Sequence, residues 1–329
     1  MKVCIVGAGA IGGLIGAKLS ATGVHQVSAL ARGATLAALR RHGFRLREGS
    51  ELQQSPVAAV EHARVLGEQD LVIIAVKAPS MAAVAASVAP LLGPQTIVLP
   101  AMNGVPWWFG AATPALGPEP LASVDPGGAI AAAIPFERVV GCVVHASALV
   151  AEPGLVVHKM GRALLIGEPL GGLSERVETL RVALEMAGFE TTASADIRRG
   201  AWYKLWGNLV MNPVSAMTGA TADRILDDPL VRRFCNAAMA EAATVGERIG
   251  CTIDQTPEDR NAVTRKLGAF KTSMLQDAEG GRPIELDAIV AAVAEIGQRV
   301  GVPTPNIDAL LGLTRLFGRV HGLYPDPPP

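Results

Sequence analysis

The chain has 329 residues, half of them apolar and 18% charged, and its formal net charge is −1. This length is sufficient for two domains with separate cores, and the charge balance excludes the strongly basic surface that binds nucleic acid. The four cysteines lie far apart and form no CxxC pair. We therefore expect buried thiols, with neither disulfides nor a metal site, at Cys4, Cys142, Cys235 and Cys251.

The first half of the chain alternates short β-branched runs with helical segments. Strand-like runs lie at 2–9, 26–32, 70–77, 96–102 and 138–146, separated by segments such as 11–23 and an alanine-rich stretch over 80–92. This alternation predicts a parallel sheet with helices on both faces. Residues 154–160 and 162–168 are expected to form an added antiparallel pair, and 189–194 another short strand.

The glycine-rich sequence GAGAIG directly follows the first strand and opens a helix. Gly7 permits a tight turn, Gly9 lets the backbone approach a pyrophosphate, and Gly12 allows close helix packing. The N–H groups of the helix N-terminus would then bind the phosphates. A lone GxGxxG motif is weak, but this position favours a dinucleotide site. The expected contacts are Gly7, Ala8, Gly9, Ala10, Ile11 and Gly12.

The end of the second strand distinguishes between dinucleotides. NAD and FAD sites usually place an acidic residue there, whereas this chain has Arg32. A guanidinium can bind a 2′-phosphate in a charge-assisted fork, so NADPH is the expected cofactor, although a solvated loop arginine is the alternative. Lys77 and Asn103 follow later strands and are expected at the same carboxyl edge of the sheet.

Residues 78–118 contain no charged side chain, which invites a membrane interpretation. Prolines interrupt the stretch, however, at Pro79, Pro90, Pro94, Pro100 and Pro106. A spanning helix needs about 20 continuous apolar residues. The apolar run near the N-terminus is also too short for a signal peptide. We therefore expect no membrane segment and a cytoplasmic location.

After residue 195 the pattern changes to long helical periods, over 197–212, 230–249, 285–300 and 305–320. Asp196 is a candidate N-cap for the first of them. We expect two domains: a nucleotide-binding domain over 1–195, of the doubly wound α/β class, and an all-helical domain over 196–329 that carries the substrate site and the catalytic groups.

Lys204, Asn208 and Asn212 recur every fourth position and share one face of the first long helix. Taken alone, they could form a solvated stripe on an amphipathic helix. In a reductase, however, a lysine can protonate the developing alkoxide, and amides can orient a polar substrate. Ser273 and Glu285 are further candidates, the glutamate as the charge that holds the lysine.

With these residues in hand, the chain resembles the ketopantoate reductase family (2-dehydropantoate 2-reductases) over nearly its whole length. The motifs GAGAIGG, VKA, MNGV, WYKLWGNLVMNP, KTSMLQD, GRPIELDAI and GVPTPNIDAL carry the resemblance, in the family's order. It implies a Rossmann domain followed by a helical domain like that of 6-phosphogluconate dehydrogenase, and NADPH-dependent reduction of ketopantoate in pantothenate biosynthesis.

The resemblance also implies roles for individual residues. Lys204 matches the catalytic lysine and Glu285 its partner glutamate, and the substrate site is matched by Asn103, Asn208, Asn212 and Ser273. The expected partner is a small 2-oxo acid, with no nucleic acid or membrane, and a homodimer is compatible with the sequence.

The chain departs from the family pattern at ATADR (220–224), at Ile289–Ala291, and by having Trp107 and Trp108 after the Asn-Gly pair. The indoles can line a pocket or belong to the core. One alternative function is therefore the reduction of another branched or bulky 2-oxo acid. An alternative of a different class is a non-catalytic Rossmann regulator that senses NADPH.

Overall fold

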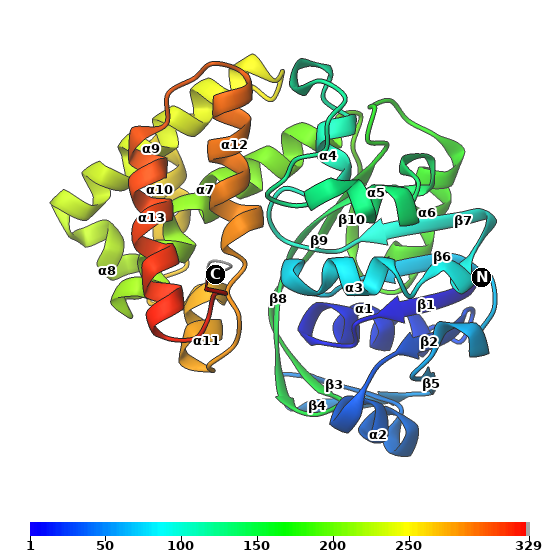
Figure 1. Cartoon of the computed structure of the whole chain (residues 1–329). Coiled ribbons are helices and arrows are strands. Elements are labelled where there is room, and N and C mark those ends of the chain that lie inside the picture. Colours follow the sequence, from blue (N-terminus) through cyan, green and yellow to red (C-terminus); the bar gives the residue numbers. More distant parts are fainter. Residues whose placement is uncertain (327–329) are drawn as a thin grey trace. The chain divides into compact units, whose positions relative to one another are not determined.

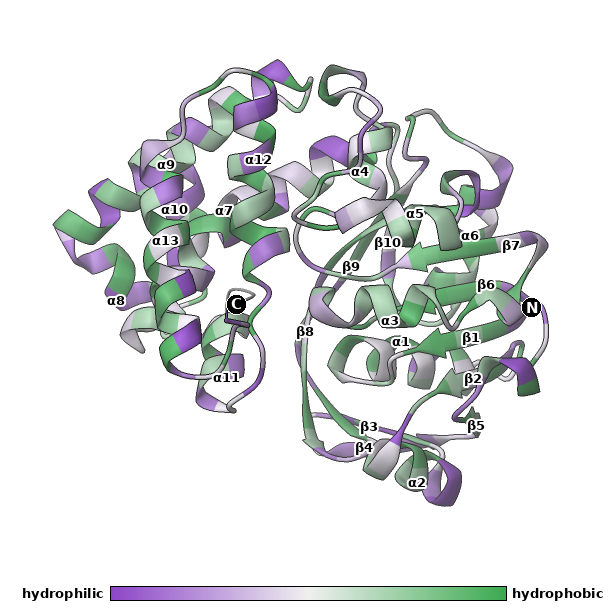
Figure 2. Ribbon diagram, viewed as in Figure 1, coloured by the Kyte–Doolittle hydropathy of each residue, from purple (hydrophilic) through white to green (hydrophobic). Residues whose placement is uncertain are grey.

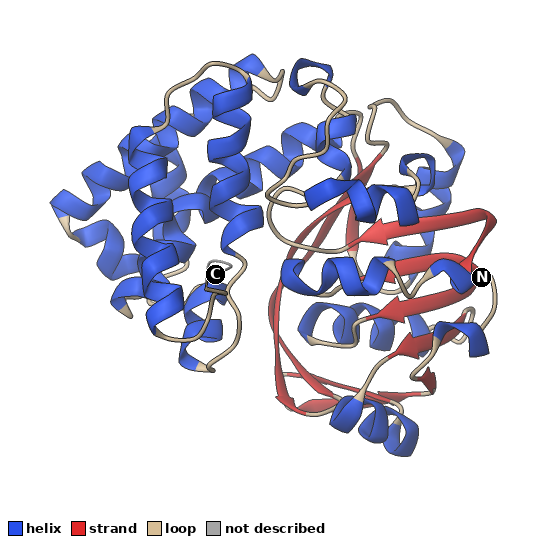
Figure 3. Cartoon of the chain, viewed as in Figure 1, coloured by secondary structure: helices blue, strands red, loops and turns tan. Residues whose placement is uncertain are grey.

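The computed structural model describes residues 1–326, whose contacts divide the chain into two compact units. The first consists of residues 1–102 and 129–200, and the second of 103–128 together with the chain after 200. All strands of the described part belong to the first unit, and the second is helical (Figure 3). The structure thus confirms the predicted order of an α/β domain followed by an all-helical one.

The first unit contains a five-stranded sheet in the order β5-β2-β1-β6-β7, in which every pair is parallel (Figure 1). This is the strand order 3-2-1-4-5 of a Rossmann fold. The central strands are buried on both faces, and Figure 2 shows most of β1 and β6 as hydrophobic, as expected for a covered parallel sheet. The strands are β1 (Lys2–Val6), β2 (Gln26–Leu30), β5 (Ala58–Val60), β6 (Gln69–Ile74) and β7 (Leu92–Pro100).

Helix α1 (Ala10–Ala21) packs against this sheet and also against a second one, because two glycines leave it without side chains there. A Cβ at Gly13 would lie 2.6 Å from Val156 Cγ2, and one at Gly16 would lie 2.5 Å from the ring of Phe44. Such distances do not occur for real Cβ atoms. The core of the unit therefore forms around α1, with Ile5, Leu14, Ile15, Leu19, Phe44, Leu46, Val156 and Leu164.

The second sheet corrects two expectations. Residues 154–160 and 162–168 are not a hairpin but one strand, β9 (Leu155–Gly167). Gly161 between them adopts a positive φ of 71° at a bulge, which lies between the pairs His145–Ala163 and Ser147–Met160. Residues 138–146 do not join the parallel sheet as a strand; Val139 makes an isolated bridge to Val98, and the chain then enters β8 (Gly141–Glu152), antiparallel to β9. The remaining strands of this sheet are β3 (Phe44–Glu48), β4 (Glu51–Ser55) and β10 (Glu190–Ala193), which the sequence predicted only in part.

The other helical segments of the first unit are short, apart from the two that follow β2 and β9. The alanine-rich stretch is less helical than expected: the α-helix stops at Ala85, and Pro90, which has no N–H to donate, lies in a separate 3₁₀ turn. The segments are α2 (Gly33–His42), η1 (Ala63–Val65), η2 (Ala78–Ser80), α3 (Met81–Ala85), η3 (Ala89–Leu91), α5 (Ala129–Ala133), η6 (Phe136–Arg138) and α6 (Glu175–Met186).

The second unit contains the four long helical segments predicted after residue 195, apart from residues 197–200 of the first segment, which belong to the first unit. One of them, 285–300, begins as a π-turn, η7 (Asp287–Ala291), before α12 (Ala292–Arg299). At the start of the first of these segments, the Arg199 amide donates to Oδ1 of Asp196, the candidate N-cap, over 3.4 Å. The further segments are α4 (Trp108–Ala111), η4 (Pro114–Leu116), η5 (Pro126–Gly128), α7 (Ile197–Thr218), α8 (Ala222–Asp227), α9 (Pro229–Arg248), α10 (Pro257–Arg265), α11 (Ser273–Glu279) and α13 (Pro305–Val320).

Residues 103–128 belong to the helical unit although they follow β7 in the chain. Glu295 of α12 accepts hydrogen bonds from the amides of Ala122 (2.9 Å) and Ser123 (2.8 Å). Arg299 donates to the carbonyls of Glu119 and Pro120. The chain thus passes from one unit to the other three times, at 102/103, 128/129 and 200/201. A single boundary near 195 corresponds only to the last of these crossings. In the described residues, no helix has the length and apolarity to cross a membrane.

Candidate functional site

The glycine turn has the geometry that a dinucleotide needs. Gly7 has a φ of 91°, which L side chains rarely adopt, and a Cβ at Gly12 would lie 2.1 Å from the Gly7 carbonyl oxygen. In contrast, a Cβ at Gly9 would meet nothing within 4 Å. Gly9 is the N-cap of α1, whose first turn carries no acidic residue. Open space therefore lies beside a helix N-terminus that attracts anions, and the site fits a pyrophosphate.

Arg32 and Lys77 lie where the sequence predicted, after the carboxyl ends of β2 and β6. Arg32 is exposed and is the N-cap of α2, and in the described part of the chain its guanidinium makes no ion pair. Lys77 is half-buried at the start of η2, and the solvent does not reach its ammonium. An exposed guanidinium beside β2 is available for a phosphate.

Asn103 is held in place by the turn that it begins. Gly104 has a φ of 82°, and a Cβ there would lie 2.6 Å from the Ala288 carbonyl oxygen. The same oxygen accepts a hydrogen bond of 2.8 Å from the Val105 amide. The turn after β7 is therefore docked on the π-turn η7, an irregularity that occurs often at functional sites. The glycine of the Asn-Gly pair was visible in the sequence, whereas its partner Ala288 was not.

Lys204 of α7 contacts Asn103, although 101 positions separate the two residues. Its Nζ donates to Asn103 Oδ1 over 2.7 Å, and both side chains are half-buried. Asn208 is half-buried one turn further along α7, and Asn212 is only 4% exposed. In the described structure, the Nδ2 group of Asn212 is buried and has no hydrogen-bond partner. An unsatisfied buried donor is costly, so this one is well suited to bind a ligand oxygen.

Glu285 and Ser273 differ in their surroundings. Glu285 is 8% exposed and lies two residues before the π-turn that docks the Asn103 loop. Ser273 is exposed in the first turn of α11, the helix that Thr272 caps by accepting from the Leu275 amide. The structure thus joins Lys204 to Asn103 directly and connects the Asn103 loop to the segment of Glu285, while Ser273 lies on a separate short helix.

Trp107 and Trp108 are buried inside the helical unit, with exposed fractions of 5% and 2%. Trp108 packs against Phe109, whose ring stacks on Trp202 of α7 with centroids 6.0 Å apart. In residues 1–326, neither of the two indole N–H groups donates a hydrogen bond. Trp108 therefore contributes to the aromatic packing beside α7, and Trp107 is buried in the same unit.

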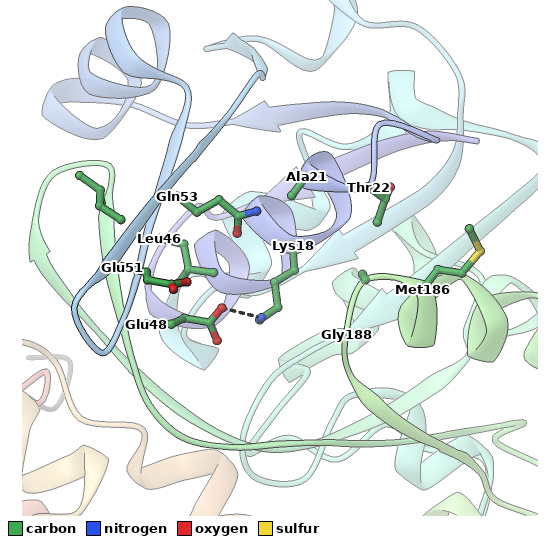
Figure 4. A pocket seen from close by; sticks show the side chains of 11 residues that line it. Lys18, Ala21, Thr22, Leu46, Glu48, Glu51, Gln53, Met186 and Gly188 are labelled. Atoms are coloured by element: carbon green, nitrogen blue, oxygen red, sulfur yellow. Dashed lines mark hydrogen bonds and ion pairs between the residues drawn. The ribbon is translucent and has the colours of Figure 1, made fainter.

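The first unit also contains a cavity of about 610 Å³ (Figure 4). It is lined by the C-terminal end of α1, by the β3–β4 hairpin and by the turn before β10. Lys18 in its wall pairs with Glu48 over 2.9 Å. Since the glycine turn is at the other end of α1, this cavity is not where the phosphates of a dinucleotide would bind.

Comparison with known proteins matches both halves of the chain to one family. The family described as "Ketopantoate reductase PanE/ApbA" matches residues 3–171, and its C-terminal counterpart matches residues 196–317. A 2-dehydropantoate 2-reductase of Mesorhizobium japonicum is 44% identical over 98% of this chain and 100% of its own length.

Two solved structures have the same fold over almost the whole chain. A candidate ketopantoate reductase of Ralstonia solanacearum is 55% identical, with a TM-score of 0.94 over 98% of this chain and 99% of its own. The 2-dehydropantoate 2-reductase of Geobacter metallireducens is 26% identical, with a TM-score of 0.85 over 96% of this chain and 100% of its own.

Proposed function

The chain belongs to the ketopantoate reductase family, and we propose that it reduces ketopantoate to pantoate with NADPH, a step of pantothenate biosynthesis. The hydrogen bond between Lys204 and Asn103 is the observation that most supports this proposal. It brings the only lysine of α7 to the loop after β7, where the fold predicts the nicotinamide end of the cofactor.

The proposed reaction converts a 2-oxo acid, NADPH and one proton into a 2-hydroxy acid and NADP⁺. NADPH, when bound, supplies the hydride that reduces the keto carbon. Lys204 supplies the proton, which passes from Nζ to the oxygen as that oxygen becomes an alkoxide. Asn103 directs one of the three N–H groups of the ammonium, and Glu285 provides a negative charge that favours the protonated lysine.

The asparagines of α7 would orient the substrate. Within residues 1–326, the amide donor of Asn212 has no hydrogen-bond partner, and Asn208 faces the same side of the helix one turn earlier. Hydrogen bonds from both to substrate oxygens would hold the keto group near Lys204, and Ser273 would add a hydroxyl. Bringing the reacting groups together in this way lowers the entropic part of the barrier.

For the cofactor, we propose that the glycine turn (residues 7–12) binds the pyrophosphate and that Arg32 binds the 2′-phosphate. Lys77 adds a positive charge near the adenosine end, and Asn103 contributes from the loop after β7. The open space at Gly9 and the exposed guanidinium of Arg32 support this assignment. We propose residues 1–195 as the nucleotide-binding domain and residues 196–329 as the catalytic domain.

The decisive experiment follows NADPH oxidation by the purified protein against ketopantoate, a smaller branched 2-oxo acid and an aryl 2-oxo acid. We expect the highest kcat/KM with ketopantoate. A higher value with another acid would support the alternative substrate, while NADPH binding without turnover on any acid would support the sensor. The mutant Lys204→Ala, which should bind NADPH but turn over slowly, is the control for contaminating reductases.

We also propose a cytoplasmic location and a homodimer. All four cysteines are buried, and within residues 1–326 none of them forms a disulfide, which fits a reducing compartment. A dimeric ketopantoate reductase of Staphylococcus aureus has this fold, and the dimer is proposed here by analogy with it.

A further inference from the structure

The C-terminal segment holds the residues on both sides of Glu285. The Ile284 amide donates to the Leu323 carbonyl over 3.0 Å, and the Tyr324 hydroxyl donates to Asp287 Oδ1 over 2.7 Å. Ile284 directly precedes Glu285, and Asp287 begins the π-turn two residues after it. One bond thus fixes the backbone before the glutamate and the other fixes a side chain just after it.

The segment that makes these two bonds is itself fixed to the end of α13. The amides of Leu323 and Tyr324 both donate to the Gly318 carbonyl, over 2.7 and 3.2 Å. A Cβ at Gly318 would lie 2.7 Å from the Tyr324 Cβ, so this close return of the chain requires glycine. Leu323 is buried, and the Arg319 guanidinium lies 5.8 Å from the centre of the Tyr324 ring.

The chemistry of the Tyr324–Asp287 pair suits a fixed contact. Burial raises the pKa of Asp287, while the bond from Tyr324 and the positive charge of Arg315 oppose that shift. Burial, together with the bond to Asp287, raises the pKa of Tyr324 to about 12. The phenol therefore stays protonated and remains a donor at neutral pH, and in residues 1–326 it is the hydrogen-bond donor to this carboxylate.

We propose that Tyr324 is a positioning residue, which acts through Asp287 to hold Glu285 and the π-turn in place. The inference rests on the proposed function, in which Glu285 stabilises the charged form of Lys204. The π-turn is contacted from two directions: Tyr324 binds Asp287, and the Val105 amide binds Ala288 beside the loop that presents Asn103. Movement of this turn would displace both the glutamate and the partner of Lys204.

The test compares Tyr324→Phe with the unchanged full chain. The substitution keeps the ring and its packing and removes only the hydroxyl. We expect kcat to fall about three- to tenfold, because one hydrogen bond to a charged group is lost. The Kd for NADPH should stay the same, and the melting temperature nearly so. Amide hydrogen exchange over residues 284–291 should become faster.

The matched control is Tyr203→Phe, which removes the hydroxyl of the other tyrosine, bonded to Gln255 at an exposed position. It should leave kcat and the exchange over 284–291 unchanged. Asp287→Asn keeps an oxygen that can accept from Tyr324 and should retain more activity than Asp287→Ala. Adding Tyr324→Phe to Asp287→Ala should cause little further loss, because the two residues act through one bond.

Two results separate this inference from the proposed function. If the unchanged protein reduces no 2-oxo acid, the proposed function fails, and hydrogen exchange alone decides whether Tyr324 fixes the Glu285 segment. If Tyr324→Phe leaves both kcat and the exchange over 284–291 at the values of the unchanged chain, or lowers only the melting temperature, Tyr324 is not a positioning residue.

Discussion

Lys204 differs from most of its neighbours on α7, which are buried and apolar, such as Leu205, Trp206 and Leu209. The face shared by Lys204, Asn208 and Asn212 is half-buried to buried, and in the part of the chain that the structure describes the Nδ2 group of Asn212 has no hydrogen-bond partner. A solvated stripe would be exposed, and it would satisfy its polar groups with water. The burial of these residues therefore favours a binding face over a surface stripe.

We expect Lys204→Ala to lower kcat about 10²- to 10⁴-fold, the usual contribution of general acid catalysis. Steady-state kinetics on the best substrate measures this loss, while fluorescence titration should give an unchanged Kd for NADPH. Lys266→Ala, at an exposed lysine after α10, is the control and should have normal kinetics. Near-normal turnover of Lys204→Ala would contradict the proposed mechanism.

Arg32→Ala should weaken the binding of NADPH much more than that of NADH. Loss of one charge-assisted contact to the 2′-phosphate is worth roughly 1.5–3 kcal/mol, or about ten- to a hundredfold in Kd. Calorimetric titration with both cofactors measures the difference. Arg41→Ala, on the exposed last turn of α2, should change neither Kd. An equal effect of Arg32→Ala on both cofactors would show that Arg32 does not contact the phosphate.

At the scale of elements, one arginine holds together β9, α6 and the 136–138 turn. Arg176 of α6 donates to Glu168 at the end of β9 over 2.7 Å and to the carbonyls of Glu137 and Val139. The Ser174 hydroxyl, which caps α6, donates to the same carboxylate. The hydrogen bond from Arg176 is the main reason why the pKa of Glu168 is lowered, although burial opposes it.

Glu168→Gln should therefore destabilise the protein by about 1–2 kcal/mol at neutral pH. Because the folded-state pKa lies below the unfolded one, this stabilisation is present above the unfolded pKa and is lost as pH falls through the folded value. The melting temperatures of both proteins should thus converge in acid, once the pH has fallen below the lowered pKa of Glu168. Glu178→Gln, which breaks an exposed ion pair with Arg181, should change the melting temperature little at neutral or at acid pH. A gap in melting temperature that stays constant down to acid pH would show that the charge of Glu168 is not responsible.

The aromatic cluster beside α7 permits a second test at this scale. Trp108→Ala should destabilise the helical unit by about 3–5 kcal/mol, as expected for a buried aromatic residue, and Trp108→Phe by less. If the indoles are structural, the relative kcat/KM values across the panel of 2-oxo acids will not change. A shift in preference toward bulkier acids, in either Trp107→Ala or Trp108→Ala, would instead show that they line the substrate site.

At the scale of the whole molecule, the helical unit is assembled from two separate parts of the chain. Residues 103–128 return from the end of the parallel sheet, and Glu295 and Arg299 of α12 bind their backbone. The turn that begins this segment carries Asn103 to Lys204. The proposed catalytic lysine, Lys204, and its partner Asn103 are therefore held within the helical unit, although Asn103 follows β7, a strand of the first unit.

The proposed homodimer predicts a molar mass in solution of twice the 34.0 kDa of one chain. Light scattering after size-exclusion chromatography measures it, and dilution over a range of concentrations tests whether the dimer dissociates. A mass equal to one chain at all concentrations would contradict the proposal.

The sequence by itself determined the features that depend on local spacing. The glycines of residues 7–12 indicate a turn with close backbone contacts, and a spacing of four puts Lys204, Asn208 and Asn212 on one helix face, because the period of a helix is nearly constant. The change in the period of the hydrophobic pattern along the chain likewise predicted an α/β domain followed by a helical domain.

Only the tertiary structure decided which distant residues meet. It made β9 one strand, because Gly161 forms a bulge there and not a turn, and it moved residues 103–128 into the helical unit. It also paired Lys204 with Asn103 and Tyr324 with Asp287. Such contacts depend on how whole elements pack, and local periodicity carries no information about partners that are tens of residues apart in the chain.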